Sequence, residues 1–124
     1  MKYEEIYDDF KNLFPEDSSF FTKKEEETAA DKEDGMHIVF GMVICPYLLK
    51  IANEDPVKTQ KAFDFIEQMQ TSGDSNIENV AEVSVLEVII TDKNGGMKLF
   101  GKYLGEESRK TVDHLSKYFK IEKE

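Results

Sequence analysis

Apolar side chains recur at intervals of three and four residues along most of the chain, and this spacing predicts helices. The first predicted helix covers residues 3–14, where one apolar face is followed by Pro15, which should end the helix. Its apolar positions are Tyr3, Ile6, Tyr7, Phe10, Leu13 and Phe14.

The most apolar stretch of the chain begins after Gly35 and predicts a central helix. At 100° per residue its apolar groups cover nearly the whole circumference, so such a helix must be surrounded by other elements. Pro46 lacks a backbone N–H and should bend the helix near Met42 and Val43. The stretch is shorter than the roughly 20 apolar residues that span a bilayer. We therefore expect a core helix and no membrane anchor.

Capping residues predict two more helices in the middle of the chain. Asp55 and Pro56 suit the N-cap and the first position of one helix, and Asp74 or Ser75 caps the next. Residues 83–90 are rich in β-branched side chains, so a strand is the alternative there. The cap and the 3.6-residue period of the preceding turns favour the helix.

Glycines mark the remaining boundaries. Gly95 and Gly96 break the chain before a predicted helix over 97–104, and Gly105 separates it from a last helix over 106–119. The predicted fold is all-α, a compact bundle or a short HEAT-like stack of about six helices. Helices that start about every 20 residues are typical of such stacks, and short connections make neighbours antiparallel.

The length of 124 residues predicts a single helical domain over residues 1–124. Within it, the acidic segment 16–34 leaves two alternatives, a polar helix or a mobile linker. Phe20 and Phe21 are apolar, but the residues that follow them show no buried face. The consecutive glutamates from Glu25 to Glu27 favour a solvated segment.

Charge is sorted along the chain. Residues 1–34 hold 12 acidic and 5 basic side chains, residues 35–92 hold 9 and 3, and residues 93–124 hold 5 and 8. The net charge of −10 repels phosphate backbones and anionic headgroups, so we expect no nucleic-acid and no membrane partner. Basic proteins are the expected partners, although many carboxylates can serve solubility alone.

No spacing of Ser, His, Cys, Asp or Glu indicates a catalytic or metal-binding set. Cys45 and His37 lie eight residues apart, about two helical turns, which is too far for a nucleophile and its base to touch. Glu33 and Asp34 beside His37 could supply metal ligands, but such groups are common in acidic loops, and His114 is remote in sequence. We expect no enzymatic activity, no metal and no cofactor.

Cysteine usage and the N-terminal residues predict a location. Cys45 is the only cysteine, so the chain cannot form an internal disulfide. The first ten residues lack the basic start and apolar run of a secretory signal. Both features favour a cytoplasmic protein.

Acidic side chains on rigid helices are the remaining candidates for a binding surface. Glu78 and Glu82 lie one turn apart on the least apolar side of their helix, and Asp64 and Glu67 occupy the polar side of the helix before it. Such carboxylates would steer a basic partner, while an aromatic anchor such as Tyr47 would supply affinity. The candidate partner-binding residues are Glu33, Asp34, Asp64, Glu67, Asp74, Glu78, Glu82, Asp92 and Tyr47.

Several features together indicate a family. They are the small size, the acidity, the lone cysteine, the core run DGMHIVFGMVICPYLLKIAN and the later segments FDFIEQM and NVAEVSVLEVIITD. In these the chain resembles the small acidic helical immunity proteins of bacterial contact-dependent and other polymorphic toxin systems. The resemblance implies a cytosolic protein that binds one cognate toxin tightly, blocks its active site or substrate surface and has no turnover. Such toxins are often basic nucleases.

The functional hypothesis is therefore a stoichiometric protein inhibitor, an immunity protein that binds and neutralises a cognate, basic toxin such as a nuclease. The alternative is a helical scaffold or adaptor that binds a regulatory partner through the same surface. Affinity separates the two, because an immunity protein should bind at about nanomolar strength or tighter, whereas an adaptor can bind weakly. The sequence does not indicate an oligomeric state.

Overall fold

The computed structural model describes residues 1–92 and 95–119, and every regular element within them is helical. The prediction of an all-α fold is confirmed. One hydrophobic core contains side chains from Ile6 near the N-terminus to Leu115 in the last helix. Lys93, Asn94 and residues 120–124 lie outside the described residues, so part of the basic C-terminal segment is not covered.

The regular elements of residues 1–92 and 95–119 are nine α-helical segments, four 3₁₀ turns and two π-helical segments. The α-helices are α1 Ile6–Asn12, α2 Ser18–Thr28, α3 Met36–Val39, α4 Cys45–Glu54, α5 Pro56–Gln70, α6 Ser75–Asn79, α7 Glu87–Ile90, α8 Gly96–Phe100 and α9 Glu106–Phe119. The 3₁₀ turns are η1 Tyr3–Glu5, η2 Pro15–Asp17, η3 Lys32–Asp34 and η6 Gly101–Tyr103, and the π-helical segments are η4 Phe40–Ile44 and η5 Val80–Leu86.

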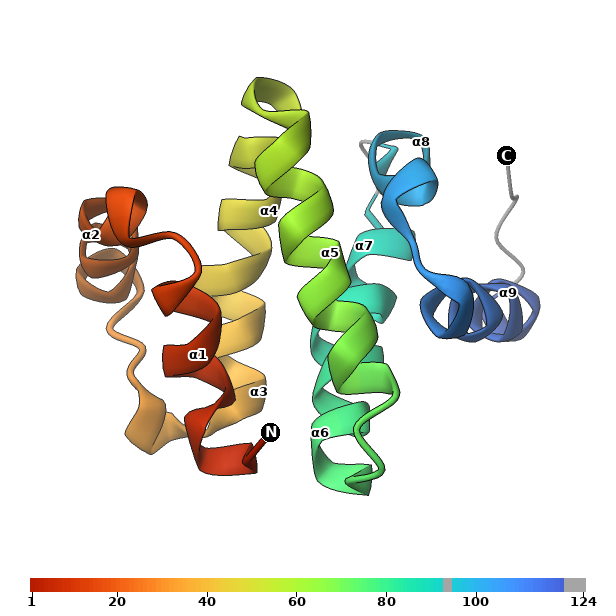
Figure 1. The fold of residues 1–124 in the computed structure, drawn as a ribbon, viewed down its shortest axis with the longest axis horizontal. Helices are drawn as coiled ribbons and strands as arrows, with labels where there is room; N and C mark the ends of the chain where they lie inside the picture. The colour runs from red at the N-terminus through yellow and green to blue at the C-terminus, as the bar shows by residue number, and fades with distance from the viewer. Residues whose placement is uncertain (93–94, 120–124) are drawn as a thin grey trace.

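The first three of these 3₁₀ turns precede the central helix, and the fourth, η6, follows α8 and leads to α9. The helices α1, α3–α4, α5 and α6–α7 lie side by side, with α2 at one flank and α8 and α9 at the other (Figure 1). The connections on either side of α5 are short, which makes α5 antiparallel to both α4 and α6. Because α5 contacts α4, α6, η5 and α9, it joins the two halves of the molecule.

The apolar stretch 36–54 forms the central helical run, as predicted. By length and composition alone this run could cross a membrane, but half of its most apolar window is buried inside the fold, as in a core helix. The expected distortion ahead of Pro46 takes the form of the π-helical segment Phe40–Ile44, in which the N–H of Cys45 donates to the carbonyl of Phe40, five residues back. A proline without an N–H leaves a carbonyl of the preceding turn free, which favours such a widened turn.

Residues 83–90 are helical, so the strand alternative is wrong. The segment Val80–Leu86 is a π-helix, which the sequence analysis did not predict, and the N–H of Glu87 donates to the carbonyl of Glu82, five residues back. The two π-helical segments η4 and η5 pack against each other in the centre of the molecule.

The acidic segment 16–34 contains an α-helix over Ser18–Thr28, so the linker alternative is wrong for these residues. Phe21 is buried, and its ring centroid lies 4.6 Å from that of Tyr47. Phe20 packs at 5.4 Å from the same ring. These contacts attach α2 to the central helix through Phe20 and Phe21. The acidic composition of the segment had given no indication of this buried face.

Two glycines give opposite stability predictions. Gly41 lies inside the central helix, and a Cβ there would meet no atom within 4 Å. We expect Gly41→Ala to raise the free energy of unfolding by about 0.5 to 1 kcal/mol, because alanine has less backbone freedom to lose on folding. A Cβ on Gly96 would collide with the backbone carbonyl of Ile89. Gly96→Ala should therefore lower the free energy of unfolding by about 1 to 3 kcal/mol. Urea denaturation measures both, and equal changes would contradict this packing.

Candidate protein-binding site

Glu67, one of the predicted partner-binding residues, stabilises the end of a neighbouring helix. Its carboxylate accepts the backbone N–H groups of Glu107 and Ser108 at 2.8 and 2.9 Å, in the first turn of α9. Partial burial opposes ionisation, but these two N–H donors outweigh it and hold the pKa of Glu67 below its usual value. A carboxylate at a helix N-terminus satisfies N–H groups that lack an intrahelical partner.

Asp74 and Glu78 serve the start of α6. Asp74 is its N-cap and accepts from the N–H groups of Asn76 and Ile77. Glu78 accepts the N–H of Gly73 at 3.0 Å, and its side chain remains half-buried. The sequence indicated Asp74 both as a possible cap and as a binding residue. In the structure Asp74 is the N-cap of α6.

The expectation that Tyr47 offers an exposed aromatic anchor is wrong. Its side chain is fully buried beneath α2, where its hydroxyl donates to Asp17 at 2.5 Å. Lys58 donates to the same carboxylate at 2.7 Å. Although burial acts in the opposite direction, Lys58 and Tyr47 together hold the pKa of Asp17 below its usual value. Tyr47 thus links α2, α4 and α5 and cannot reach a partner in this fold.

The other predicted carboxylates lie at separate places. Glu33 and Asp34 are exposed in η3, directly before α3, and Asp34 closes a capping box with Asp31. Asp64 is exposed on α5 and accepts a hydrogen bond from Gln60. The nine predicted residues therefore do not all serve an exposed surface, because Tyr47 is buried and Asp34, Glu67 and Asp74 accept backbone N–H groups at helix starts.

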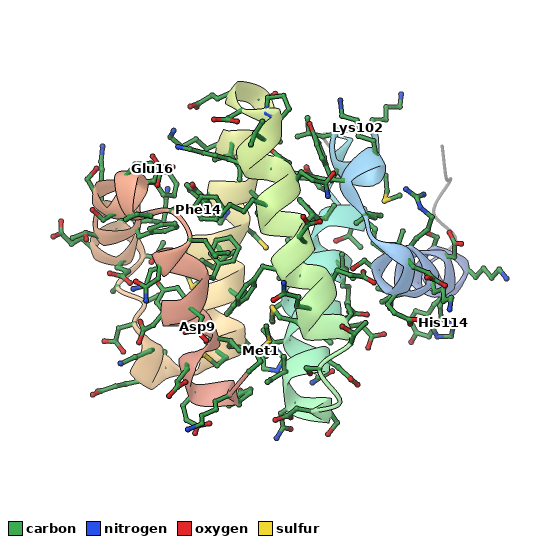
Figure 2. All side chains as sticks on the ribbon, viewed as in Figure 1. Met1, Asp9, Phe14, Glu16, Lys102 and His114 are labelled. Carbon is green, nitrogen blue, oxygen red and sulfur yellow. The ribbon has the colours of Figure 1, made fainter. Side chains whose placement is uncertain are left out.

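Charge that is sorted along the sequence is also sorted in space. Asp9 and Glu16 lie on the side of the N-terminal helices, whereas Lys102 and His114 lie on the side of α8 and α9 (Figure 2). Phe14, from the end of the first helix, points inward to the aromatic core, where its ring lies 5.4 Å from that of Phe10. The acidic and basic parts of the chain thus occupy opposite flanks.

Five exposed apolar side chains lie on two helical runs that contact each other, α3–α4 and η5–α7, and the sequence analysis missed them. They are Ile38, Met42, Leu49, Val83 and Val88, each 41 to 44 % exposed. We call these five residues the apolar strip. A single exposed aliphatic residue is ordinary, but several neighbouring ones are typical of an interaction surface.

The π-helical segments align the members of the strip. Val83 and Val88 are five residues apart, a spacing that a π-helical turn places on one side of a helix. Between the two rows of the strip, the thiol of Cys45 donates to the carbonyl of Ser84 at 3.1 Å. Leu49 and Val88 meet at one end, where both line the same pocket.

That pocket is a small apolar cavity of about 230 Å³ between α4, α7 and α8. Its lining is mainly hydrophobic, with one carboxylate at the edge. The lining residues are Cys45, Leu49, Val88, Ile89, Asp92 and Phe100. Among the predicted binding residues, Asp92 is the one that reaches this cavity.

A row of carboxylates follows the strip along the same helix. Glu82 and Glu87 each precede a valine of the strip by one residue, and Glu78 lies one turn before Glu82. We call these three residues the acidic row. All three are half-buried, and no lysine, arginine or histidine nitrogen of residues 1–92 and 95–119 lies within 4.0 Å of their carboxylates in an ion pair. Glu78 accepts the backbone N–H of Gly73, so Glu82 and Glu87 are the members of the row whose carboxylates have no described hydrogen-bond or ion-pair partner.

The structure brings His37 and Ser84 together, a pair that the sequence separates by 47 positions. His37 Nδ1 lies 2.7 Å from Ser84 Oγ. Ser84 is buried, and neither residue lines any of the cavities described here. Cys45 is close by, and burial raises the pKa of its thiol to about 12. This cluster joins α3 and α4 to η5, and its thiol is held in the neutral form.

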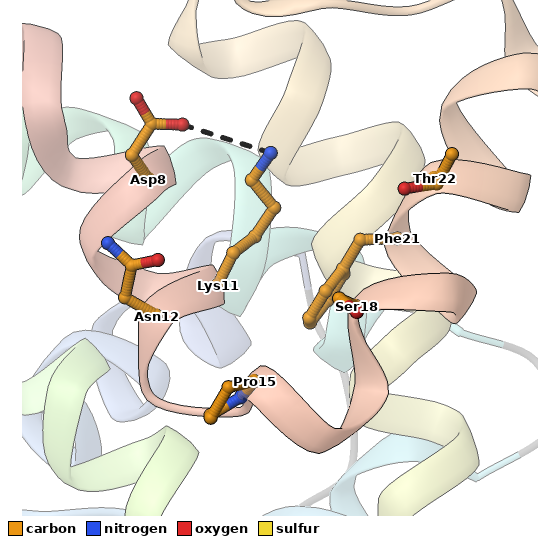
Figure 3. A pocket seen from close by; sticks show the side chains of 7 residues that line it. All are labelled: Asp8, Lys11, Asn12, Pro15, Ser18, Phe21 and Thr22. Atoms are coloured by element: carbon orange, nitrogen blue, oxygen red, sulfur yellow. Dashed lines mark ion pairs between the residues drawn. The ribbon is translucent and has the colours of Figure 1, made fainter.

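A second, more open cavity of about 550 Å³ lies between α1 and α2 (Figure 3). Its cationic group, Lys11, is paired with Asp8 at 3.8 Å and with Glu25 at 3.1 Å. Tyr7 also donates to Glu25, at 2.5 Å. The charged side chains here hold α1 and α2 together, so both charged groups that line this cavity, Asp8 and Lys11, are already paired.

Within the part of the chain that the structure describes, no group of three or more His, Cys, Asp or Glu side chains is placed to hold a metal ion. His37 and the neighbouring Glu33 and Asp34, weighed as ligands from the sequence, do not form such a group. The feature best suited to recognition is thus the apolar strip beside the acidic row.

The chain belongs to a domain family of unknown function, DUF7674, whose match covers residues 7–120. No curated protein and no solved structure matches the chain. The family match covers α2 to α9 and all but the first residue of α1, and it includes both helices that carry the apolar strip.

The cap on α9 gives a prediction with a pH dependence. Glu67→Ala should lower the free energy of unfolding by about 1 to 2 kcal/mol at pH 7, because two N–H groups lose their acceptor. Since folding lowers the pKa of Glu67, its stabilisation is complete above the usual pKa of a glutamate and is lost as the pH falls through the lowered value. Urea denaturation at pH 7 and pH 3 measures this effect. The difference in free energy of unfolding between the wild-type protein and Glu67→Ala should be smaller at pH 3.

Asp64→Ala on the same helix is the matched control, since Asp64 is exposed and accepts one hydrogen bond from Gln60. We expect it to change the free energy of unfolding by less than about 0.5 kcal/mol. A Glu67→Ala deficit that stayed constant between the two pH values would contradict the charged cap.

The buried thiol gives a second prediction. Cys45 is 6 % exposed and its pKa is raised to about 12, so its reaction with Ellman's reagent at pH 8 should be at least about 100-fold slower in the native protein than in urea. Absorbance at the thiolate product band follows both reactions. Equal rates would show that the thiol is accessible and ionisable in the native fold.

Proposed function

We propose that this protein acts by binding another protein stoichiometrically, as an immunity protein that neutralises a basic bacterial toxin such as a nuclease. The observation that carries the proposal is the acidic row beside the apolar strip. It combines carboxylates that have no cationic partner among residues 1–92 and 95–119 with exposed aliphatic side chains on two adjoining helices. Charge of this kind speeds the encounter with a basic partner, and apolar contact supplies affinity.

The net charge of −10 supports the same partner class. A basic nuclease exposes the cationic surface with which it binds phosphates, and an acidic protein can cover that surface. The segregation of charge gives the molecule an acidic flank at α1 and α2, which adds to the long-range attraction (Figure 2). Inhibition would follow from occupation of the toxin's substrate surface, with no chemical step by this chain.

The roles of the polar groups in the interior also support a binding protein. Tyr7, Tyr47 and Asp17 sit in hydrogen-bonded contacts between helices, and Cys45 has a raised pKa. Each of these groups is accounted for by packing. A nucleophile or general base would instead need a pKa near the working pH and access to a cavity.

Growth rescue tests the proposal. We expect the gene beside the one for this chain to encode a protein with a basic toxin domain, whose expression arrests growth. Coexpression of this chain should restore growth, and the two purified proteins should form a one-to-one complex with a Kd at or below about 1 nM by calorimetry. A neighbouring gene without such a domain, or arrest that coexpression does not relieve, would contradict the immunity function.

A pair of matched variants tests the charge argument in that complex. Glu82→Lys with Glu87→Lys should weaken binding at least about 10-fold in low salt, and the loss should shrink as the salt concentration rises. Glu4→Lys with Glu5→Lys makes the same change in net charge on exposed residues of η1, and should weaken binding less than about threefold. Equal losses of affinity in the two variants would show that binding depends on the net charge of the molecule and not on the acidic row. Weak binding with several partners would indicate an adaptor.

A further inference from the structure

We propose that the apolar strip is the docking site for one amphipathic, lysine- or arginine-bearing helix of the partner protein. This inference rests on the proposed function, because it names the part of the partner that is recognised. The helix would lie across α3–α4 and η5–α7, with its apolar side on the strip and its basic side chains over the acidic row. Helices that bind grooves in this way use aliphatic residues spaced three, four and seven apart.

The shape of the strip favours a helix as the occupant. Ile38, Met42 and Leu49 lie four and seven residues apart along the central run, and Val83 and Val88 form a second row. Gly41 precedes Met42 on the same run, and a Cβ on it would meet no atom within 4 Å, so there is open space at that glycine. Two apolar rows on adjoining helices can contact one helix along its length.

The cavity at the end of the strip provides a place for an anchor. It has a volume of about 230 Å³, opens beside Leu49 and Val88, and has the aromatic ring of Phe100 in its wall. A buried aliphatic or aromatic side chain in such a cavity typically contributes much of the affinity of an interface. We therefore infer that the partner helix inserts one large apolar side chain here.

The negative charge of the acidic row favours a basic partner helix and disfavours a second copy of this chain. The acidic row runs beside Val83 and Val88 and has no described basic partner within its own chain. A symmetric dimer through the strip would bring two molecules of net charge −10 together, with both acidic rows close to the interface. A basic helix would instead neutralise the row.

Two synthetic helical peptides test this directly with the full chain. Both have about 20 residues and leucines on one face, and they differ in whether lysine or glutamate occupies the flanks. We expect the lysine peptide to bind at least about 10-fold more tightly by fluorescence anisotropy. In amide NMR spectra, its binding should shift the signals of residues in η4, α4, η5 and α7.

Two single variants with the same charge change locate the site. Met42→Glu places a carboxylate in the strip, whereas Val57→Glu places one on a side chain that is 78 % exposed on α5. We expect Met42→Glu to weaken binding of the lysine peptide at least about 10-fold, and Val57→Glu to change it less than about twofold. Because both side chains are exposed, thermal unfolding should confirm that both variants fold.

Each outcome is decisive. No binding of the lysine peptide, equal binding of the two peptides, or shifted signals confined to other helices would overturn the docking site. Sedimentation that shows a dimer which Met42→Glu dissociates would assign the strip to a second copy and would also overturn it. Peptide binding without growth rescue would remove the immunity function alone, and rescue without peptide binding would remove the docking site alone.

Discussion

The enclosure of the central run Met36–Glu54 is the constraint on which the rest of the structure depends. Apolar side chains surround nearly its whole circumference, so α1, α2, α5 and η5 must each cover part of it. Tyr47 is buried in this enclosure, where the rings of Phe10 from α1 and Phe21 from α2 pack against it. The burial of these groups is the main source of stability, and it leaves one line of the helix, at Ile38, Met42 and Leu49, without cover from the described chain.

The two π-helical segments connect this packing to the surface. The widened turn ahead of Pro46 and the one at Val80–Leu86 face each other, and Cys45 and Ser84 bond between them. Residues five apart thereby share a side, which sets Val83 and Val88 in one exposed row. The same packing that satisfies the interior thus produces the apolar strip, and the acidic row follows as the neighbouring line of the same helix.

The polar residues divide into those that hold the fold together and those that remain available. Asp17, Glu67 and Asp74 accept hydrogen bonds from a lysine and a tyrosine or from helix N-termini, and replacing them affects packing first. Glu82 and Glu87 have no such duty among the described contacts. In a chain this acidic, composition alone does not separate the two groups, because an isolated glutamate looks the same in sequence whether it caps a helix or meets a partner.

The sequence by itself determined the features that depend on near neighbours. The helical class, the caps at Asp55 and Asp74 and the distortion ahead of Pro46 follow from spacing and backbone chemistry within a few residues. Tertiary structure alone decided that Tyr47 is buried, that Glu67 caps a helix 40 residues away and that the apolar strip is left exposed. Those outcomes depend on which helices pack together, and burial and long-range hydrogen bonds exist only once that packing has formed.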